Sequence, residues 1–177
     1  LTAEVVNGVI YIIGGQVSDG SYVETVQSYN ITNNSITTVA PLPTKRKQLN
    51  SVVYGNKIYV IGGQLENDGA MTNVVEVYNP SVDLWTTLSP MPTARECDVA
   101  LIEDKIYAFG GYNGSTSLTT VEIYDIENDS WTTANDMPYA LSAYHLASFE
   151  NFVFLFGDYS AHIDEVRSEE RRVGKEC

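Results

Sequence analysis

Two arginines, Arg46 and Arg95, are the residues whose type and position best suit chemistry on a ligand. Each follows a proline by three residues, in matching places of two similar segments. A guanidinium pairs with a carboxylate in bidentate geometry, so either arginine could hold an anionic ligand. The alternative is a buried ion pair within the protein, for which Glu96 and Asp98 are the candidate partners. Both interpretations are open on the sequence alone.

The other residues with nucleophilic or metal-binding side chains do not form a set. The two histidines, His145 and His162, are 17 positions apart, and Cys97 is far from both in sequence. A metal centre needs several ligands with supporting hydrogen bonds. The chain also lacks the Gly-x-Ser-x-Gly and His-Glu-x-x-His motifs and a phosphate-binding loop. We therefore predict no cofactor, no metal and no catalytic residue, and we expect binding rather than catalysis.

Composition restricts the class of partner. Of the 177 residues, 44% are hydrophobic and 11% aromatic, which is typical of a globular domain. The formal net charge of -13 repels phosphate backbones and anionic lipid head groups. No apolar run approaches the roughly 20 residues of a membrane-spanning helix. We expect neither nucleic acid nor a membrane as a partner.

Both arginines belong to a unit that repeats along the chain. Its mark is a glycine pair after an apolar run, and successive pairs begin 48, 48 and 47 residues apart. Further along each repeat, a tyrosine is followed by a bulky apolar residue seven positions later. The glycine sites are Gly14-Gly15, Gly62-Gly63, Gly110-Gly111 and Gly157-Asp158, and the tyrosine pairs are Tyr29 with Ile36, Tyr78 with Trp85 and Tyr124 with Trp131. A fixed period of this length indicates a repeat architecture.

Each repeat contains four apolar runs of strand length. Turn signals such as Gly55-Asn56 and Asn79-Pro80 separate them, as is typical of strands joined by tight turns. No segment shows a helical period with caps. The predicted strands of the second repeat cover residues 51–54, 58–61, 74–78 and 84–88. The sequence therefore predicts an all-β fold of four-stranded antiparallel meanders.

The glycine pairs, the spaced tyrosine and tryptophan and the Met-Pro that follows them resemble the Kelch repeat. The resemblance covers residues 1 to about 166 and implies a Kelch-type β-propeller, with one four-stranded blade for each repeat. Because propellers close with typically about four to eight blades, it also implies a partial propeller and further blades of the same chain. The predicted boundaries are 1–47 for blade 1, 48–95 for blade 2, 96–142 for blade 3 and 143–166 for a partial blade 4.

The signature residues are predicted to serve packing. Glycine lets neighbouring backbones approach closely and accepts positive φ, so we assign a structural role to both glycines of the first three pairs. Trp85 and Trp131 are expected between adjacent blades, with Tyr78 and Tyr124 beside them. The alternative for these tryptophans is stacking on a sugar. Leu141 occupies the place of the arginines in the third repeat.

Polar loops of unequal length follow the glycine pairs. Asp19-Gly20, Asp68-Gly69 and Asn113-Gly114 occupy matching places in these loops and are typical of turns. Variable loops on a rigid scaffold commonly carry binding function. Tyr112 and Asn113 are therefore candidate binding residues, in addition to Arg46 and Arg95.

The last eleven residues, 167–177, do not continue the repeat. They read RSEERRVGKEC and contain four of the ten basic residues of the chain. The string resembles a translated sequencing adapter, so we predict a non-native tail and exclude it from the fold.

Two functions are compatible with the sequence. The first is a Kelch-repeat scaffold or adaptor that recognises a protein partner through its loops. The alternative is a fragment of a carbohydrate-active Kelch enzyme, such as a sialic acid epimerase, in which Arg46 or Arg95 would pair with a substrate carboxylate. The absence of a catalytic set in the sequence favours the scaffold. The sequence assigns no cellular compartment.

Overall fold

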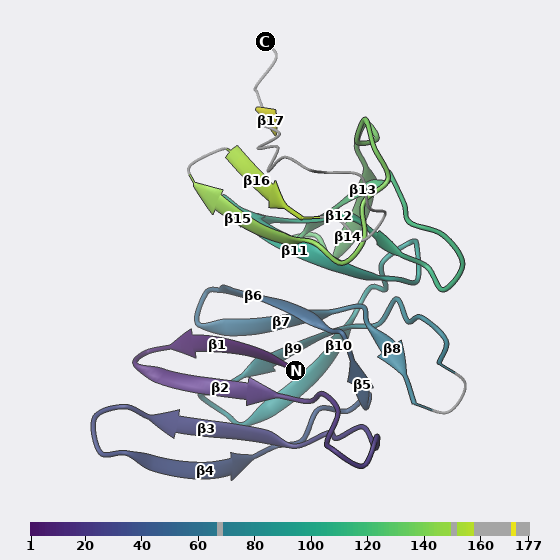
Figure 1. Ribbon diagram of the computed structural model, residues 1–177. Helices are drawn as coiled ribbons and strands as arrows, with labels where there is room; N and C mark the ends of the chain where they lie inside the picture. Colours follow the sequence, from purple (N-terminus) through teal and green to yellow (C-terminus); the bar gives the residue numbers. More distant parts are fainter. Residues whose placement is uncertain (67–68, 150–151, 158–170, 173–177) are drawn as a thin grey trace. The chain divides into compact units, whose positions relative to one another are not determined.

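Figure 1 shows the computed structural model of the chain, which describes residues 1–66, 69–149, 152–157 and 171–172. The chain divides into two compact units, residues 1–96 and residues 97–177. Strands are the only regular elements among the described residues. In the same part of the chain, no helix has the length and apolar character needed to cross a bilayer. The prediction of an all-β fold is confirmed.

The first unit begins with a four-stranded antiparallel sheet in chain order. The β1–β2 hairpin turns at Asn7 and Gly8, whose φ angles of 50° and 76° match a type I′ turn. This turn sets the register of the hairpin, in which Val6 lies opposite Val9. The strands are β1 (Thr2–Val6), β2 (Val9–Ile13), β3 (Val26–Asn30) and β4 (Ser35–Val39).

A second sheet of the same design follows in the first unit. Its β6–β7 hairpin also turns through two residues of positive φ, Gly55 at 57° and Asn56 at 60°. The strands are β6 (Asn50–Tyr54), β7 (Lys57–Ile61), β9 (Val75–Asn79) and β10 (Leu84–Leu88), with β5 (Arg46–Lys47) and β8 (Gln64–Leu65) forming a separate two-stranded ladder. These strands lie within one residue of the predicted ranges, so the antiparallel meander is confirmed.

The two sheets of the first unit pack face to face. The ring of Tyr11 meets the ring of Tyr78 edge-on at 5.7 Å, and the hydroxyls of Thr2 and Ser51 are 2.6 Å apart. Buried side chains from both sheets fill the space between them, among them Val6, Ile13, Val26, Leu42, Leu49, Ile58 and Val60. We call this interface the first joint. It stabilises both sheets because apolar surface leaves water on each side.

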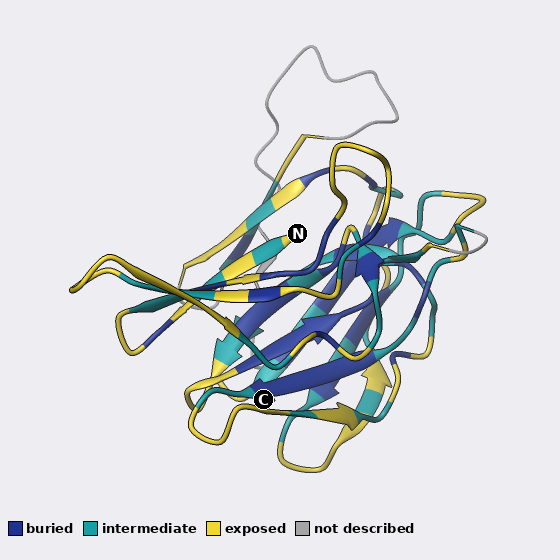
Figure 2. Cartoon of the chain, turned by 90° about the horizontal axis from the view of Figure 1, so that it is seen from below, coloured by how far each residue is buried: buried dark blue, intermediate teal, exposed yellow. Residues whose placement is uncertain are grey.

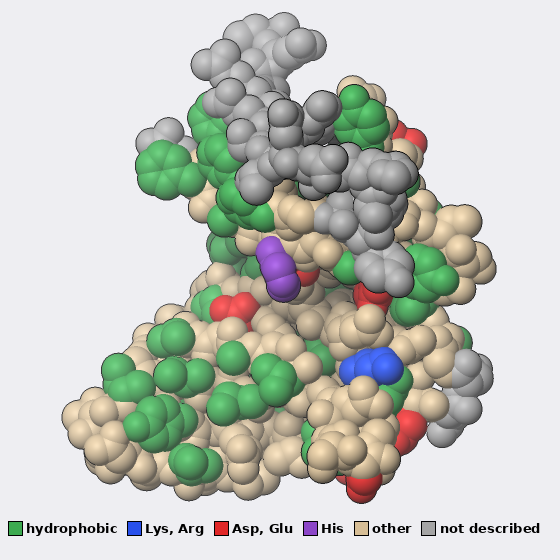
Figure 3. Space-filling view, viewed as in Figure 1, with side chains coloured by type: hydrophobic (Ala, Val, Ile, Leu, Met, Phe, Trp, Pro, Cys, Tyr) green, Lys and Arg blue, Asp and Glu red, His purple; other side chains and the backbone are tan. Residues whose placement is uncertain are grey.

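The opposite side of the first sheet is uncovered within the first unit. Residues that pair directly across antiparallel strands share a face, and the observed register places eight side chains on this side. They are Ala3, Val5, Ile10, Ile12, Gln27, Tyr29, Ile36 and Thr38. We call this surface the open face. Figure 3 shows hydrophobic side chains gathered over the first sheet.

The second unit contains a four-stranded sheet and part of another. In the buried core, the hydroxyl of Tyr144 donates a hydrogen bond to the carbonyl of Phe109, and Ala100, Val121, Met137 and Val153 pack nearby. Figure 2 shows that burial concentrates on inner strands while hairpin tips are exposed. The strands are β11 (Glu96–Ile102), β12 (Lys105–Tyr112), β13 (Val121–Asp125), β14 (Ser130–Thr133), β15 (His145–Phe149), β16 (Phe152–Phe156) and β17 (Arg171–Arg172).

The glycine pair of the second repeat has the geometry expected of a structural role. Gly62 and Gly63 have φ angles of 60° and 107°, a backbone conformation that residues with a side chain rarely adopt. A Cβ on Gly63 would lie 2.5 Å from the carbonyl oxygen of Lys47, too close for any real contact. The backbone of the segment before β6 therefore approaches this strand end only because the pair lacks side chains.

Some predictions fall outside the described residues. His162, Asp68 and Asp158 lie there, as do residues 150–151 and 158–166 of the predicted partial blade 143–166. Of the predicted non-native tail, only the backbone of β17 is described, where it pairs with β16. The blade boundaries and the origin of the tail remain predictions.

Candidate functional site

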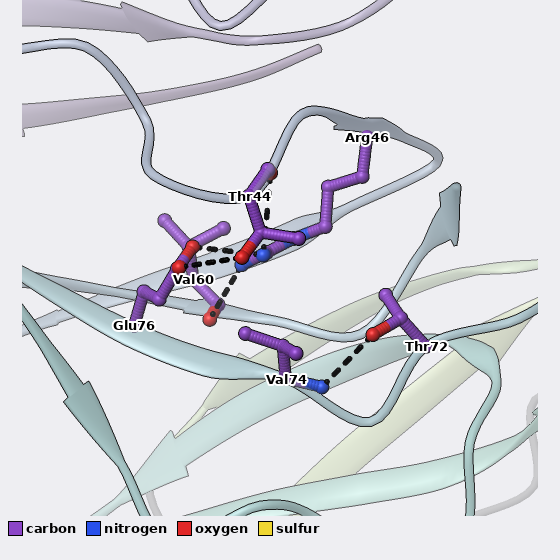
Figure 4. Close-up of polar contacts among 6 residues, drawn as sticks. All are labelled: Thr44, Arg46, Val60, Thr72, Val74 and Glu76. Atoms are coloured by element: carbon purple, nitrogen blue, oxygen red, sulfur yellow. Dashed lines mark hydrogen bonds and ion pairs between the residues drawn. The ribbon is translucent and has the colours of Figure 1, made fainter. Parts of the chain in front are cut away.

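The first candidate, Arg46, lies in β5 and pairs with Glu76 of the second sheet, on the face that packs in the first joint. Its side chain is fully buried, and Nη1 donates a hydrogen bond to Oε2 of Glu76 at 2.8 Å. The hydroxyl of Thr44 donates to the other carboxylate oxygen of Glu76 at 2.7 Å, and Nη2 of Arg46 donates to the carbonyl of Val60 at 3.3 Å. Figure 4 shows the side chains of Thr44, Arg46 and Glu76 meeting beside the backbone carbonyl of Val60. Both terminal nitrogens of the guanidinium therefore donate to acceptors within the protein.

The electrostatics of this cluster depend on the ion pair. Burial lowers the pKa of Arg46, and the Glu76 carboxylate opposes that shift. A guanidinium stays protonated in proteins, so the buried charge must be compensated by its partner. The partner is Glu76; the sequence suggestion of Glu96 or Asp98 was wrong for Arg46. The suggestion rested on carboxylates near an arginine in sequence, whereas the folded sheets place Arg46 beside a carboxylate thirty residues away.

Arg95 occupies the equivalent place of the second repeat and is also fully buried. Thr93 precedes it by two residues, as Thr44 precedes Arg46. Of the two acidic residues suggested as partners, Asp98 accepts the backbone N–H of Leu146 at 3.1 Å. Burial raises the pKa of the Glu96 carboxyl group. Neither buried arginine offers a guanidinium to solvent in this structure.

A second polar link in the first joint joins the β9–β10 hairpin to the first sheet. Trp85 donates its indole N–H to the carbonyl of Ala40 at 2.9 Å, while Asp83 accepts the N–H of the same residue at 2.8 Å. The hydroxyl of Tyr78 donates to the same Asp83 oxygen at 2.6 Å. Trp85 therefore lies between the two sheets with its ring 5.0 Å from that of Tyr78. This geometry supports a packing role rather than sugar stacking.

The acceptor of this tyrosine is a residue that sequence reasoning missed. Five positions after each tyrosine stands an Asn or Asp of positive φ, and its side chain accepts the tyrosine hydroxyl. The three pairs are Tyr29 with Asn34 at 2.7 Å, Tyr78 with Asp83 at 2.6 Å and Tyr124 with Asp129 at 2.5 Å. The signal was present as a repeated Asx two positions before Ile36, Trp85 and Trp131. In the second unit, the Trp131 ring lies 5.1 Å from Tyr124.

The loops of the first unit interlock at one end of the sheets. Tyr22 donates its backbone N–H to Glu66 at 2.8 Å, and the ammonium of Lys47 lies 5.0 Å above the Tyr22 ring. Lys45 is within 3.3 Å of Glu24 and 3.6 Å of Glu66. These carboxylates raise the pKa of Lys45, with Glu24 as the main cause. We call this surface, formed by residues 16–24, Lys45, Lys47 and residues 64–66, the loop platform.

Glutamine side chains order the loops themselves. Gln16 donates its side-chain amide to the carbonyl of Gly20 at 2.8 Å, and Gln64 does the same to Gly69 at 2.6 Å. Both glutamines directly follow a glycine pair. These glutamines hold the loop backbones in place. Gln16 and most of its loop are nevertheless exposed.

The loop of the second unit that carries Tyr112 and Asn113 is also ordered by its own contacts. Asn113 accepts the backbone N–H groups of Ser115 and Thr116, each at 2.9 Å. Tyr112 and Ser117 form a bridge across the base of the loop. Both candidate residues are half-buried. The structure therefore gives Asn113 a role in holding the loop, in agreement with the turn expected at Asn113-Gly114.

Within the described ranges, no group of three or more His, Cys, Asp or Glu side chains could hold a metal ion. His145, for example, lies 3.9 Å from Asp98 with its side chain 95% exposed. An exposed histidine beside one carboxylate lacks the further ligands that a metal centre requires.

The strand order and the repeated sheets define a class of protein, a partial Kelch-type β-propeller. The chain belongs to the Kelch-repeat family, since residues 1–168 match the KLHDC2/KLHL20/DRC7 Kelch-repeats domain. The solved structure of YjhT is similar to this chain, with a TM-score of 0.75 and 20% sequence identity. That match covers 88% of this chain and 56% of YjhT, so the chain spans about half the length of that structure. No curated protein sequence matches the chain.

Proposed function

We propose that this chain is part of a scaffold that binds a protein partner through its ordered loops, for which the loop platform of the first unit and the loop at residues 112–118 of the second unit are two separate candidates. The observation that carries the proposal is that these loops combine a hydrogen-bonded backbone with accessible side chains. A loop already held in one conformation loses less entropy on binding. Propeller sheets provide the rigid base on which such loops can vary.

The charge of the molecule suggests the character of the partner. The net charge is -13, and the exposed carboxylates of Glu24 and Glu66 lie on the loop platform. Lys45 offsets part of this charge by pairing with both. Complementary charge speeds association and disfavours wrong partners. We therefore expect a partner surface with a basic patch.

The enzyme alternative needs a guanidinium that can reach a substrate carboxylate. Arg46 is fully buried and bonded to Glu76, and Arg95 is also buried. Moving either arginine to a substrate would require opening a packed interior. These observations favour the scaffold over a carbohydrate-active enzyme.

The test is to identify a partner and measure its dependence on the loops. Proteins captured by the immobilised chain would be purified, and their affinity measured by calorimetry for the parent and for Tyr112→Ala and Glu66→Lys. A substitution that lies in the interface with the partner should weaken binding by about tenfold or more, and we expect this of at least one of the two. Glu127→Lys is the matched control, since Glu127 is an exposed carboxylate at the tip of the β13–β14 hairpin. Equal affinity for all variants would reject the proposed surface.

A further inference from the structure

The open face of the first sheet has a counterpart in the second sheet that is already covered. The register puts the side chains of Ser51, Val53, Ile58, Val60, Glu76, Tyr78 and Trp85 on one face of the second sheet. These occupy the same strand positions as Ala3, Val5, Ile10, Ile12, Gln27, Tyr29 and Ile36 in the first. In the second sheet this face is the one that packs in the first joint.

Exposure separates the two faces sharply. Val60 is 0% exposed and Tyr78 is 1% exposed in the first joint. On the open face, Val5 is 58% exposed, Ile12 is 37% exposed and Ile36 is 67% exposed. Contiguous apolar surface of this kind marks an interaction site. The first joint shows what kind of surface fits it, namely the packed side of another four-stranded sheet.

Three of the differences between the first sheet and its counterpart are at positions whose residues link the two sheets of the first joint. Gln27 stands in the place of Glu76, which binds Arg46 in the first joint. Ile36 stands in the place of Trp85 and has no N–H to donate to a neighbouring sheet. Asn34 stands in the place of Asp83, so the acceptor there carries no charge. The first two changes each remove a charged or polar link to the neighbour, and the third removes a charge but keeps the acceptor.

The Gln27 substitution restricts the neighbour most strongly. In the first joint, the neighbouring segment delivers a buried guanidinium that Glu76 neutralises. An amide cannot neutralise such a charge, and a buried uncompensated charge is strongly destabilising. A neighbour with arginine in the Arg46 place would therefore fit the open face badly. The third repeat of the chain has an uncharged residue in this place, Leu141.

We propose that the open face docks a further blade of the same polypeptide, and that this blade carries an uncharged residue in the place of Arg46. The first joint supports this occupant, because it joins two sheets of one chain through the equivalent face. The similarity to YjhT supports it too, since the matched region accounts for 56% of that propeller and leaves room for further blades. This joint would be held by apolar packing without a central ion pair.

The first experiment asks whether a blade docks on this face. The probe is an added copy of residues 1–48 joined in front of Leu1, which makes a Gln48-Leu1 junction like the natural Gln48-Leu49. Ile12→Cys in the original sheet would report on access through its maleimide labelling rate, followed by peptide mass spectrometry. We expect labelling to slow by about tenfold or more when an added copy with Arg46→Leu is present. Unchanged labelling would overturn the proposal.

The second experiment tests the chemistry of the joint. Added copies with Arg46 or with Arg46→Leu would be combined with Gln27 or Gln27→Glu in the original first sheet, giving four chains. With Gln27, we expect the leucine copy to raise the thermal midpoint above the arginine copy by at least about 4 °C. With Gln27→Glu, the order should reverse. The same order on both backgrounds would reject the role assigned to Gln27, even if a blade docks.

The third experiment tests the competing occupant, a second copy of the chain. The mass of the parent chain would be measured by analytical ultracentrifugation across a range of concentrations. We expect Ile12→Lys to leave its association state unchanged. A dimer of the parent that Ile12→Lys abolishes would assign the open face to a second copy and overturn the proposal.

Discussion

The first joint and the loop platform are formed by the same two repeats, but their polar side chains are buried in the joint and exposed on the platform. In the joint, Arg46, Glu76 and Tyr78 are buried, and each bonds a partner in the protein. On the platform, Glu24 and Glu66 are exposed, and the bonds instead hold the loop backbone. Residues that repeat therefore maintain the fold, while residues that vary between loops are available to a partner. The contrast can be tested by substitution on each side.

The largest effect is expected from Glu76→Ala. This change leaves Arg46 buried without its carboxylate, and losing one member of a buried pair typically costs about 3 to 5 kcal/mol. We expect urea denaturation to report a loss in this range. The matched control replaces both partners, Arg46→Met with Glu76→Leu, and should recover most of the stability. A loss below about 1 kcal/mol for Glu76→Ala would show that the ion pair is not central to the joint.

The next effect concerns Trp85. Trp85→Ala removes the ring contact with Tyr78 and the bond to Ala40, which together should cost about 3 kcal/mol. Trp85→Phe keeps a ring and loses only the indole N–H, so a cost of about 1 kcal/mol is expected. Thermal unfolding of both variants separates packing from hydrogen bonding. Equal losses would mean that the ring contributes little.

Much of the fold followed from sequence, and the reason is the repeat. The turn at Gly55-Asn56 and the apolar runs on either side of it predicted β6 and β7 within one residue. The partner of Arg46 was not found, because it depends on which strands meet across two sheets. Glu76 is the second residue of β9, and its burial cannot be predicted from the local sequence pattern. The contacts of Asn113 are local instead, with the N–H groups of Ser115 and Thr116, and the Asn113-Gly114 pair already indicated a turn there.

A smaller effect should appear in the pH dependence of the joint. The Tyr78 hydroxyl, followed by the Ala40 N–H, lowers the pKa of Asp83 below its ordinary value. A carboxyl group with a lowered folded-state pKa stabilises the protein above its unfolded pKa, and this contribution is lost as pH falls through the folded pKa. Asp83→Asn should therefore flatten the decline in thermal midpoint below about pH 4. Asn34 holds the same turn in the first repeat, so the variant should fold.

An unchanged acid profile in Asp83→Asn would mean that other carboxylates control the decline. Asp125 is the comparison, since its contact with Lys105 and the Asn128 N–H lowers its pKa to about 2. Asp125→Asn should act on the second unit and leave the link between Asp83 and Ala40 intact. Measuring both variants assigns the acid sensitivity to one unit or the other.

The smallest effect on stability is expected in the loops. Tyr112→Ala removes a half-buried side chain whose backbone forms the bridge to Ser117, so the unfolding free energy should change by no more than about 0.5 kcal/mol. Asn113→Asp keeps the acceptor for Ser115 and Thr116 and should be equally mild, whereas Asn113→Ala loses both bonds. If Tyr112→Ala lowered stability as much as Trp85→Ala, the loop would belong to the packed scaffold, and the division between repeated and variable residues would fail.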